Sequence, residues 1–402
     1  MAGLATGESI VNPDTMFSNN NIDLVVDRVK SVDRQSKMLK TAGGREISYD
    51  KLVVSTGSKP FVLPIPGNDL KGLFTLRTLV DAEDIREYIA EEKPKKIVFV
   101  GAGFINLEIA TLLVESAPDA YEVTVVELLE QPLGVMLDSD MAKPVTEYLE
   151  GRGISMLLGK QVASILGEGG KVTGVKLATG ESLGADMVFM NVGSTPDLSL
   201  AKAMDLEMGK FGIKVNPLFE TSDPHVFAGG DCIENHHFIT GNPTPIQLRG
   251  PAVIQGRAIA KRLAGFNIPF PGLLGNSATR LGDKYVAATG LTEADAAANK
   301  IETVCATVDS RSKHGMIPGV KPWRLKLVFE SKDQRLIGGQ IVSDSGSAVK
   351  EIDTVNALIT GKKTASDLVY LMCAGNPDCS SEPSLEPITI AAEQVLARVG
   401  RK

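Results

Sequence analysis

Apolar residues between positions 96 and 127 follow a pattern that predicts a strand, a turn, a helix and a second strand. The run K-I-V-F-V at 96–100 is short and continuously apolar, as a buried strand would be. The segment G-A-G-F-I-N follows directly, and a helix then extends to about Ser116. A second apolar run, at 123–126, ends at Glu127. The unit has the length of about 30 residues that is typical of a nucleotide-binding strand–helix–strand unit.

Similar patterns predict further elements on both sides of this unit. Alternating apolar and polar residues predict a strand at 22–28, and a continuous apolar run predicts a buried strand at 50–55. The region 154–188 is rich in Gly and β-formers, which is typical of an antiparallel meander. We also expect strands at 325–329 and 336–342, helices at 79–92, 138–151, 247–264, 347–360 and 388–399, and a linker at 269–275.

Composition and charge exclude several classes of protein. The chain has 402 residues, of which 43% are hydrophobic and 23% charged, so we expect a globular protein of two or three domains. The net charge of −7 disfavours binding to a nucleic-acid backbone or an anionic membrane. The most apolar stretch, 97–114, contains Asn106 and Glu108 and does not resemble a membrane span. The first residues lack a signal-peptide pattern, and four cysteines without a C-x-x-C pair favour the reducing cytoplasm.

The turn Gly101-Ala102-Gly103-Phe104-Ile105-Asn106 indicates a dinucleotide site. Gly101 would make the tight turn, and Gly103 would let the backbone approach a pyrophosphate at the positive end of a helix. Asn106 stands where Gly or Ala is usual, so we expect it to push helix and strand slightly apart. Glu127 ends the next strand, where a carboxylate accepts hydrogen bonds from ribose hydroxyls and favours NADH over NADPH. A purely structural glycine turn is the alternative.

Three more segments become informative together with this turn. Ser55-Thr56-Gly57 follows the strand at 50–55, residues 227–231 read F-A-G-G-D, and residues 191–197 read N-V-G-S-T-P-D. Alone, Asp231 is interpreted as a turn or helix-cap carboxylate. The four segments, in this order along the chain, resemble the fingerprints of the FAD-dependent pyridine nucleotide–disulfide oxidoreductase family.

The resemblance covers essentially residues 5–399. It is greatest for the branch of coenzyme A-disulfide reductases, NADH oxidases and NAD(P)H sulfur oxidoreductases, and it rests on segments 247–257, 276–292 and 376–393. It implies an α/β fold with two nested Rossmann-like dinucleotide-binding domains and a C-terminal α+β dimerisation domain. The implied parts are a first FAD segment at 1–75, an NADH-binding domain at 76–190, a second FAD segment at 191–268, and the dimerisation domain at 269–402.

The resemblance also implies roles for individual residues. Asp231 would hold the ribityl chain of FAD, Phe104 would cover the flavin where nicotinamide enters, and Glu108 would help to orient nicotinamide. Core packing is the alternative for Phe104, and a solvated arginine is the alternative to a flavin-stabilising Arg249. The implied FAD contacts are Thr56, Gly57, Gly193, Gly230, Asp231, Leu248 and Arg249, and the implied NADH contacts are Gly101, Gly103, Phe104, Ile105 and Glu127.

The first 50 residues depart from the family pattern. They contain neither a cysteine nor a glycine-rich turn between a strand and a helix. Family members would carry there the unit that binds the ADP half of FAD, and a redox cysteine soon after it. We therefore expect an incomplete FAD domain, either in a fragment of a normal enzyme or in a protein that has lost this unit. The usual lysine partner of Glu108 would lie in the same unit.

The function implied by the resemblance is that of a cytoplasmic homodimer with FAD and NADH as cofactors. Hydride would pass from NADH to FAD, and electrons would pass on to a small acceptor such as a disulfide, polysulfide or oxygen. A truncated, non-catalytic NADH-binding protein of the same fold is the alternative. Cys373 and Cys379 are the only close pair of cysteines and are either redox-active or, as we favour, buried or inert. The four histidines have no metal-ligand spacing with the cysteines, and we expect no metal.

Overall fold

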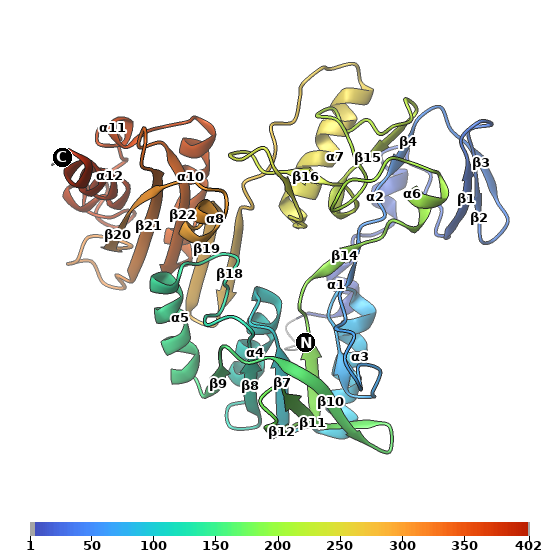
Figure 1. Ribbon diagram of the computed structural model, residues 1–402, viewed down its shortest axis with the longest axis horizontal. Coiled ribbons are helices and arrows are strands. Elements are labelled where there is room, and N and C mark those ends of the chain that lie inside the picture. The colour runs from blue at the N-terminus through green and yellow to red at the C-terminus, as the bar shows by residue number, and fades with distance from the viewer. Residues whose placement is uncertain (1–4, 401–402) are drawn as a thin grey trace.

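The computed structural model describes residues 5–400, which form three lobes (Figure 1). The lobe at the bottom of the view contains the glycine-rich turn at 101–106, and the lobe at the upper right contains the segments assigned to FAD. The C-terminal lobe, in orange and red, lies at the upper left. Two short helices, α1 (Gly7–Ile10) and α2 (Thr15–Ser18), precede the first strand.

The lower lobe is built on a five-stranded, wholly parallel sheet in the order β6-β13-β7-β8-β9. Continuous apolar runs form these strands because both faces of the sheet are buried. Helices of this lobe pack on one face, where Phe99 and Phe189 stack with ring centroids 4.8 Å apart. The elements are β6 (Leu73–Phe74), α3 (Leu79–Glu92), β7 (Lys96–Val100), α4 (Phe104–Ser116), β8 (Glu122–Val126), α5 (Ser139–Gly151), β9 (Ile154–Leu157) and β13 (Met187–Met190).

An antiparallel meander covers the other face of this sheet. It consists of β10 (Val162–Glu168), β11 (Lys171–Leu177) and β12 (Ser182–Gly184). Val175 and Leu177 of the meander belong to the same buried cluster as Val98 and Val100 of β7. The meander expected over 154–188 is thus correct for β10–β12 but wrong for its first strand, since β9 pairs in parallel with β8.

The upper right lobe contains a small parallel pair of strands and an antiparallel sheet. β4 (Leu52–Val54) and β15 (Val226–Ala228) pair in parallel, so their carboxyl ends lie at the same edge. β5 (Ser58–Pro60) and β14 (Ser194–Pro196) pair antiparallel where the chain leaves and re-enters this lobe. Its other elements are β1 (Val29–Asp33), β2 (Met38–Thr41), β3 (Glu46–Ser48), α6 (Ser199–Ala203), η1 (Gly230–Cys232), β16 (Asn235–His236), β17 (Pro243–Thr244) and α7 (Arg249–Leu263).

The C-terminal lobe has a five-stranded antiparallel sheet in the order β18-β19-β22-β21-β20. Residues of α10 and α12 share one buried core with β21 and β22. Leu281, Val286 and Val342 join the buried core of the lower lobe, so these two lobes share a packed interface. The elements are β18 (Ser277–Leu281), β19 (Lys284–Gly290), α8 (Glu293–Ala298), β20 (Thr303–Arg311), β21 (Pro322–Glu330), β22 (Leu336–Ser343), α9 (Gly346–Val349), α10 (Glu351–Thr360), α11 (Ala365–Leu368), η2 (Pro383–Leu385) and α12 (Pro387–Val399).

Three expectations about the elements need correction. Residues 22–28 form no strand, because no neighbouring strand pairs with them, and Val26 is 88% exposed. The helix expected at 347–360 is divided at Lys350, whose N–H donates to Ser347 O in a tight turn. β6 lies before the boundary expected at residue 76, yet it forms the edge of the parallel sheet.

Candidate functional site

The glycine-rich turn connects the end of β7 to the start of α4. Gly101 has φ +93°, and a Cβ there would lie 3.1 Å from Val192 Cγ1, so the turn requires glycine. Gly103 is the N-cap of α4 and has no side-chain cap. A Cβ at Gly103 would meet no heavy atom within 4 Å. The start of the helix is therefore open, and this turn fits the pyrophosphate of a dinucleotide.

Glu127 lies at the end of β8, beside this turn. Its Oε2 accepts a hydrogen bond from Ala102 N at 2.5 Å, and its Oε1 accepts one from Leu129 N at 2.8 Å. The side chain is half-buried. A carboxylate has about four acceptor sites, so these two bonds leave it able to accept ribose hydroxyls. Glu127 thus also stabilises the glycine-rich turn, through its hydrogen bond from Ala102 N.

Asn106 is fully buried, and its amide is hydrogen-bonded to the backbone at the end of β7. Its Nδ2 donates to Val100 O at 2.7 Å and to Gly101 O at 2.8 Å. The amide therefore bridges α4 and β7 at the point where a glycine would bring them together.

The next residues of α4 face different surroundings. Half-buried Phe104 packs against the core of the lower lobe and also lines the cleft between the lobes, whereas half-buried Ile105 packs against the same core without lining the cleft. Glu108 Oε1 accepts a hydrogen bond from Thr279 Oγ1 of the C-terminal lobe at 2.5 Å. Burial raises the pKa of Glu108, and the Thr279 hydroxyl opposes this only in part. Glu108 is thus held between two lobes, one turn beyond Phe104.

Asp231 and Gly57 lie where the parallel pair β4 and β15 ends. Asp231 Oδ2 accepts hydrogen bonds from Ser58 Oγ at 3.0 Å and from Arg77 at 3.3 Å. Gly57 and Gly230 have φ values of +69° and +82°, which favour glycine at both turns. Ligands of parallel sheets bind outside the carboxyl ends of the strands, so this edge suits the second dinucleotide.

Two residues of this edge were missed in the sequence. Arg77 joins the lobes, because its backbone N–H donates to Asp81 in the first turn of α3 while its guanidinium donates to Asp231. Gln255 is fully buried in α7, where it accepts from Gly230 N at 2.7 Å and donates to Asn235 Oδ1 at 2.7 Å. A glutamine on the buried face of a helix was the available signal for the second residue.

The remaining residues predicted to contact FAD lie in two places, close to the paired strands β5 and β14 and at the start of α7. Thr56 is exposed, and its Oγ1 donates to Asp197 O at 2.6 Å. Hydrogen bonds from Ser199 and the ammonium of Lys59 lower the pKa of Asp197 to about 2. Gly193, which directly precedes β14, has φ +116° and is exposed.

Leu248 and Arg249 begin α7. Leu248 is half-buried and is the N-cap of this helix, whereas Arg249 is exposed. Among residues 5–400, no carboxylate forms an ion pair with Arg249. Gln247 Nε2 donates to Asp231 O at 3.0 Å and so ties the start of this helix to the Asp231 turn.

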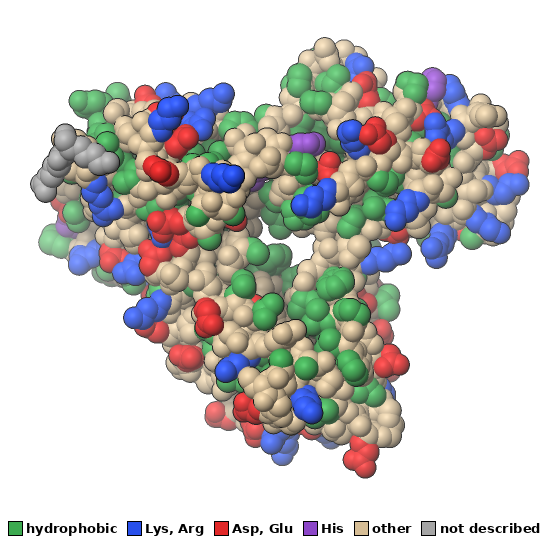
Figure 2. Space-filling model, viewed as in Figure 1, with side chains coloured by type: hydrophobic (Ala, Val, Ile, Leu, Met, Phe, Trp, Pro, Cys, Tyr) green, Lys and Arg blue, Asp and Glu red, His purple; other side chains and the backbone are tan. Residues whose placement is uncertain are grey.

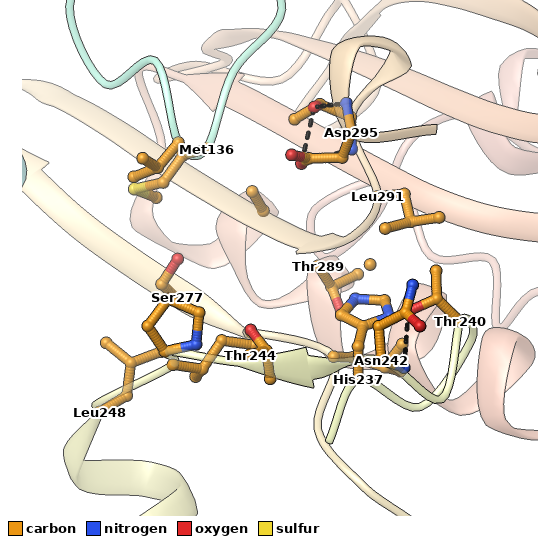
Figure 3. A pocket seen from close by; sticks show the side chains of 18 of the residues that line it. Met136, His237, Thr240, Asn242, Thr244, Leu248, Ser277, Thr289, Leu291 and Asp295 are labelled. Atoms are coloured by element: carbon orange, nitrogen blue, oxygen red, sulfur yellow. Dashed lines mark hydrogen bonds between the residues drawn. The ribbon is translucent and has the colours of Figure 1, made fainter. Parts of the chain in front are cut away.

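One cleft brings residues of the three lobes together. Its volume is about 780 Å³, and its walls include Phe104 and Met136 of the lower lobe, Leu248 of the upper right lobe and Thr289 of the C-terminal lobe. Figure 2 shows the hollow at which the lobes meet, with hydrophobic side chains on its walls. His237 points into this cleft (Figure 3), and burial lowers its pKa. The cleft thus lies between Phe104, at the start of α4, and Leu248, at the start of α7.

The four cysteines are free, and one group of three carboxylates in the described part of the chain surrounds a lysine. Cys373 and Cys379 are exposed, so they are not buried thiols, and their expected inertness stays a prediction, whereas Cys232 is a buried core residue. The carboxylates of Asp138, Asp140 and Glu293 lie within reach of one another, but the Lys326 ammonium binds all three.

Comparison with known proteins identifies the family. The model of the pyridine nucleotide-disulphide oxidoreductase family matches residues 5–256, and the model of its dimerisation domain matches residues 279–386. The chain belongs to this family. The expected family, fold class, enzyme class and cofactors, FAD and NADH, are thereby confirmed.

Relatives of this oxidoreductase family match nearly the whole chain. An NADH oxidase of Methanocaldococcus jannaschii is 36% identical over 97% of this chain and 86% of its own. The CoA-dependent NAD(P)H sulfur oxidoreductase of Pyrococcus furiosus is 30% identical over 97% and 87%. Among solved structures, the NAD-dependent persulfide reductase from A. fulgidus has a TM-score of 0.91 at 31% identity, covering 97% of this chain and 72% of its own. Among the described residues, no helix has the length and hydrophobicity to cross a bilayer.

Proposed function

We propose that this chain is an NADH:acceptor oxidoreductase in which hydride passes from NADH to FAD and electrons pass on to a disulfide, a polysulfide or oxygen. The observation that carries the proposal is the shared cleft. Phe104, which follows the glycine-rich turn, and Leu248, which belongs to the second FAD segment, both line this cleft. Similarity to NADH oxidases and sulfur reductases supports these acceptor classes. The dimerisation domain supports a homodimer, and four free cysteines support the cytoplasm.

The residues of the chain would bind and orient the two cofactors. The redox chemistry would come from bound NADH and FAD. Gly101 and Gly103 would admit the NADH pyrophosphate to the start of α4, and Glu127 would accept its ribose hydroxyls. Asp231, held by Arg77, would accept hydroxyls of the flavin side chain. Phe104 would cover the site of nicotinamide entry, and Glu108 would orient the carboxamide.

Anaerobic titration of the FAD-reconstituted protein with NADH tests the function. We expect NADH to bleach the flavin absorbance, and separate additions of a disulfide, a polysulfide or oxygen then show which acceptor restores it. A protein that binds NADH but retains no flavin would support the non-catalytic alternative. A flavinated protein that NADH does not bleach would contradict the proposal.

Replacing Glu127 with alanine tests the assignment of its carboxylate. We expect the ratio of the NADPH and NADH dissociation constants to fall by about tenfold, or ~1.4 kcal/mol, because the charge that repels a 2′-phosphate is removed. Glu122→Ala is the matched control, since Glu122 is exposed at the opposite end of β8. Calorimetric titration with both nucleotides measures the ratio, and an unchanged ratio in Glu127→Ala removes the assignment.

A further inference from the structure

Asn106 occupies the position of the glycine-rich turn where Gly or Ala normally allows helix and strand to pack closely. We propose that Asn106 and Asn191 form a positioning pair that holds the Gly101–Gly103 turn in the conformation that binds the NADH pyrophosphate. This proposal rests on the proposed function, and it concerns a residue pair outside the expected nucleotide contacts.

Asn106 fixes the turn from the helix side. Its amide nitrogen donates both hydrogens, one to Val100 O at 2.7 Å and one to Gly101 O at 2.8 Å. The N–H of Gly101 donates to Val126 O at 2.8 Å. The peptide groups of Gly101 are therefore bonded to α4 on one side and to β8 on the other. An unbonded buried carbonyl would cost about 1 to 3 kcal/mol.

Asn191 fixes the orientation of the Asn106 amide. It follows β13, the neighbour of β7, and its Nδ2 donates to Asn106 Oδ1 at 2.8 Å. Its own Oδ1 accepts from Leu76 N at 2.8 Å. Carbonyls only accept and backbone N–H groups only donate, so this network allows one orientation of each amide. Each of the four amide atoms has a partner, and the pair is complete only when both asparagines are present.

The pair also explains why an asparagine is tolerated at this position. Without Asn191, the buried Asn106 oxygen would lack a donor. If the Asn106 amide then rotated, its nitrogen would no longer donate to the carbonyls of Val100 and Gly101. With Asn106 changed to glycine, the Asn191 amide would lose its acceptor instead. Removal of both amides leaves neither side chain unpaired, but Val100 O, Gly101 O and Leu76 N then lose the partners that the pair supplies. The two positions are therefore expected to be coupled in a double-mutant cycle.

The cycle consists of wild type, Asn191→Leu, Asn106→Gly and the double variant. ADP-ribose is the probe, because it carries the pyrophosphate without the nicotinamide, and calorimetry measures its dissociation constant. We expect Asn191→Leu to weaken binding about tenfold, or ~1.4 kcal/mol. Asn106→Gly is expected to weaken binding at least as much, because Gly101 O loses its donor, and the double variant is expected to bind no more weakly than Asn106→Gly, because Asn191 acts on the turn only through Asn106.

A matched control separates positioning from stability. Asn356 Nδ2 donates to Asn276 Oδ1 at 2.6 Å in the C-terminal lobe, so Asn356→Leu removes another asparagine pair without touching the turn. It is expected to lower the melting temperature and leave ADP-ribose binding unchanged. If Asn191→Leu also changes only the melting temperature, or if the double variant shows no coupling, the positioning role is wrong. If wild type does not bind ADP-ribose, the proposed function fails and the positioning role fails with it.

Discussion

Replacing Lys326 with methionine is expected to lower the free energy of unfolding by about 3 to 5 kcal/mol, the loss typical of a buried ion pair deprived of one partner. The Lys326 side chain is 3% exposed, and its ammonium lies 2.7 Å from Asp140 and 2.5 Å from Glu293. Burial alone would lower the pKa of Lys326, but these hydrogen bonds outweigh burial and raise it. The lysine is therefore charged at neutral pH, and methionine would fill its volume without its charge.

Asp138 makes this loss large. Its side chain is 8% exposed and 3.1 Å from the lysine, and it also accepts hydrogen bonds from Gln340 Nε2 and Glu293 N. In the variant this carboxylate would remain buried without a cation. Asp138 directly precedes α5 of the lower lobe, whereas Lys326, Gln340 and Glu293 belong to the C-terminal lobe. The variant should therefore also loosen the contact between these lobes.

Urea unfolding followed by fluorescence measures the effect. Trp323, the only tryptophan, lies buried in β21, the strand that carries Lys326. Lys350→Met is the matched control, because Lys350 is 80% exposed and pairs with Asp353 on the surface, where such pairs contribute about 0 to 1 kcal/mol. A loss for Lys326→Met no greater than that of the control would show that the buried lysine contributes little. Lys326→Arg keeps the charge and should retain part of the stability.

The sequence predicted elements best where the local pattern and the packing agree. The strand at 96–100 and the helix at 79–92 have the expected bounds, because continuous apolar runs and capping residues mark their ends. The strand at 22–28 was wrong because alternation is a local property, whereas a strand also needs a neighbouring strand. The break at Lys350 depends on a tight turn that leaves no signal in the pattern.

The candidate site was predicted only as far as its motifs extend along the chain. Gly101 and Gly103 stand in one turn that the spacing reveals. Asn191 lies 85 positions from Asn106, and Arg77 lies 154 positions from Asp231, so only the fold brings these partners together. Asn106 was expected only to push helix and strand apart, because its partner Asn191, directly after β13, could not be inferred from the sequence pattern. Long-range polar pairs of this kind need coordinates.

Replacing Gly103 with valine is expected to raise the dissociation constant of NADH about 100-fold, or ~2.7 kcal/mol, while the protein remains folded. The backbone of Gly103 has φ −76° and ψ 168°, an extended conformation that valine adopts readily. Beyond the adjacent residues, no heavy atom lies within 4 Å of the Cβ position, so there is room for a side chain at this position. That side chain would occupy the space in which the pyrophosphate approaches the start of α4.

Gly151→Val is the matched control for this variant. Gly151 ends α5, away from the turn, and its Cβ position likewise has no heavy atom within 4 Å. Both variants are expected to melt within about 2 °C of wild type, which corresponds to less than about 1 kcal/mol, and both should retain FAD. Only Gly103→Val should lose NADH binding in calorimetry. The two valines are introduced at different sites, but the Cβ position is equally free of neighbouring atoms at both. If both variants bind NADH with equal affinity, the nucleotide does not approach the turn at Gly103.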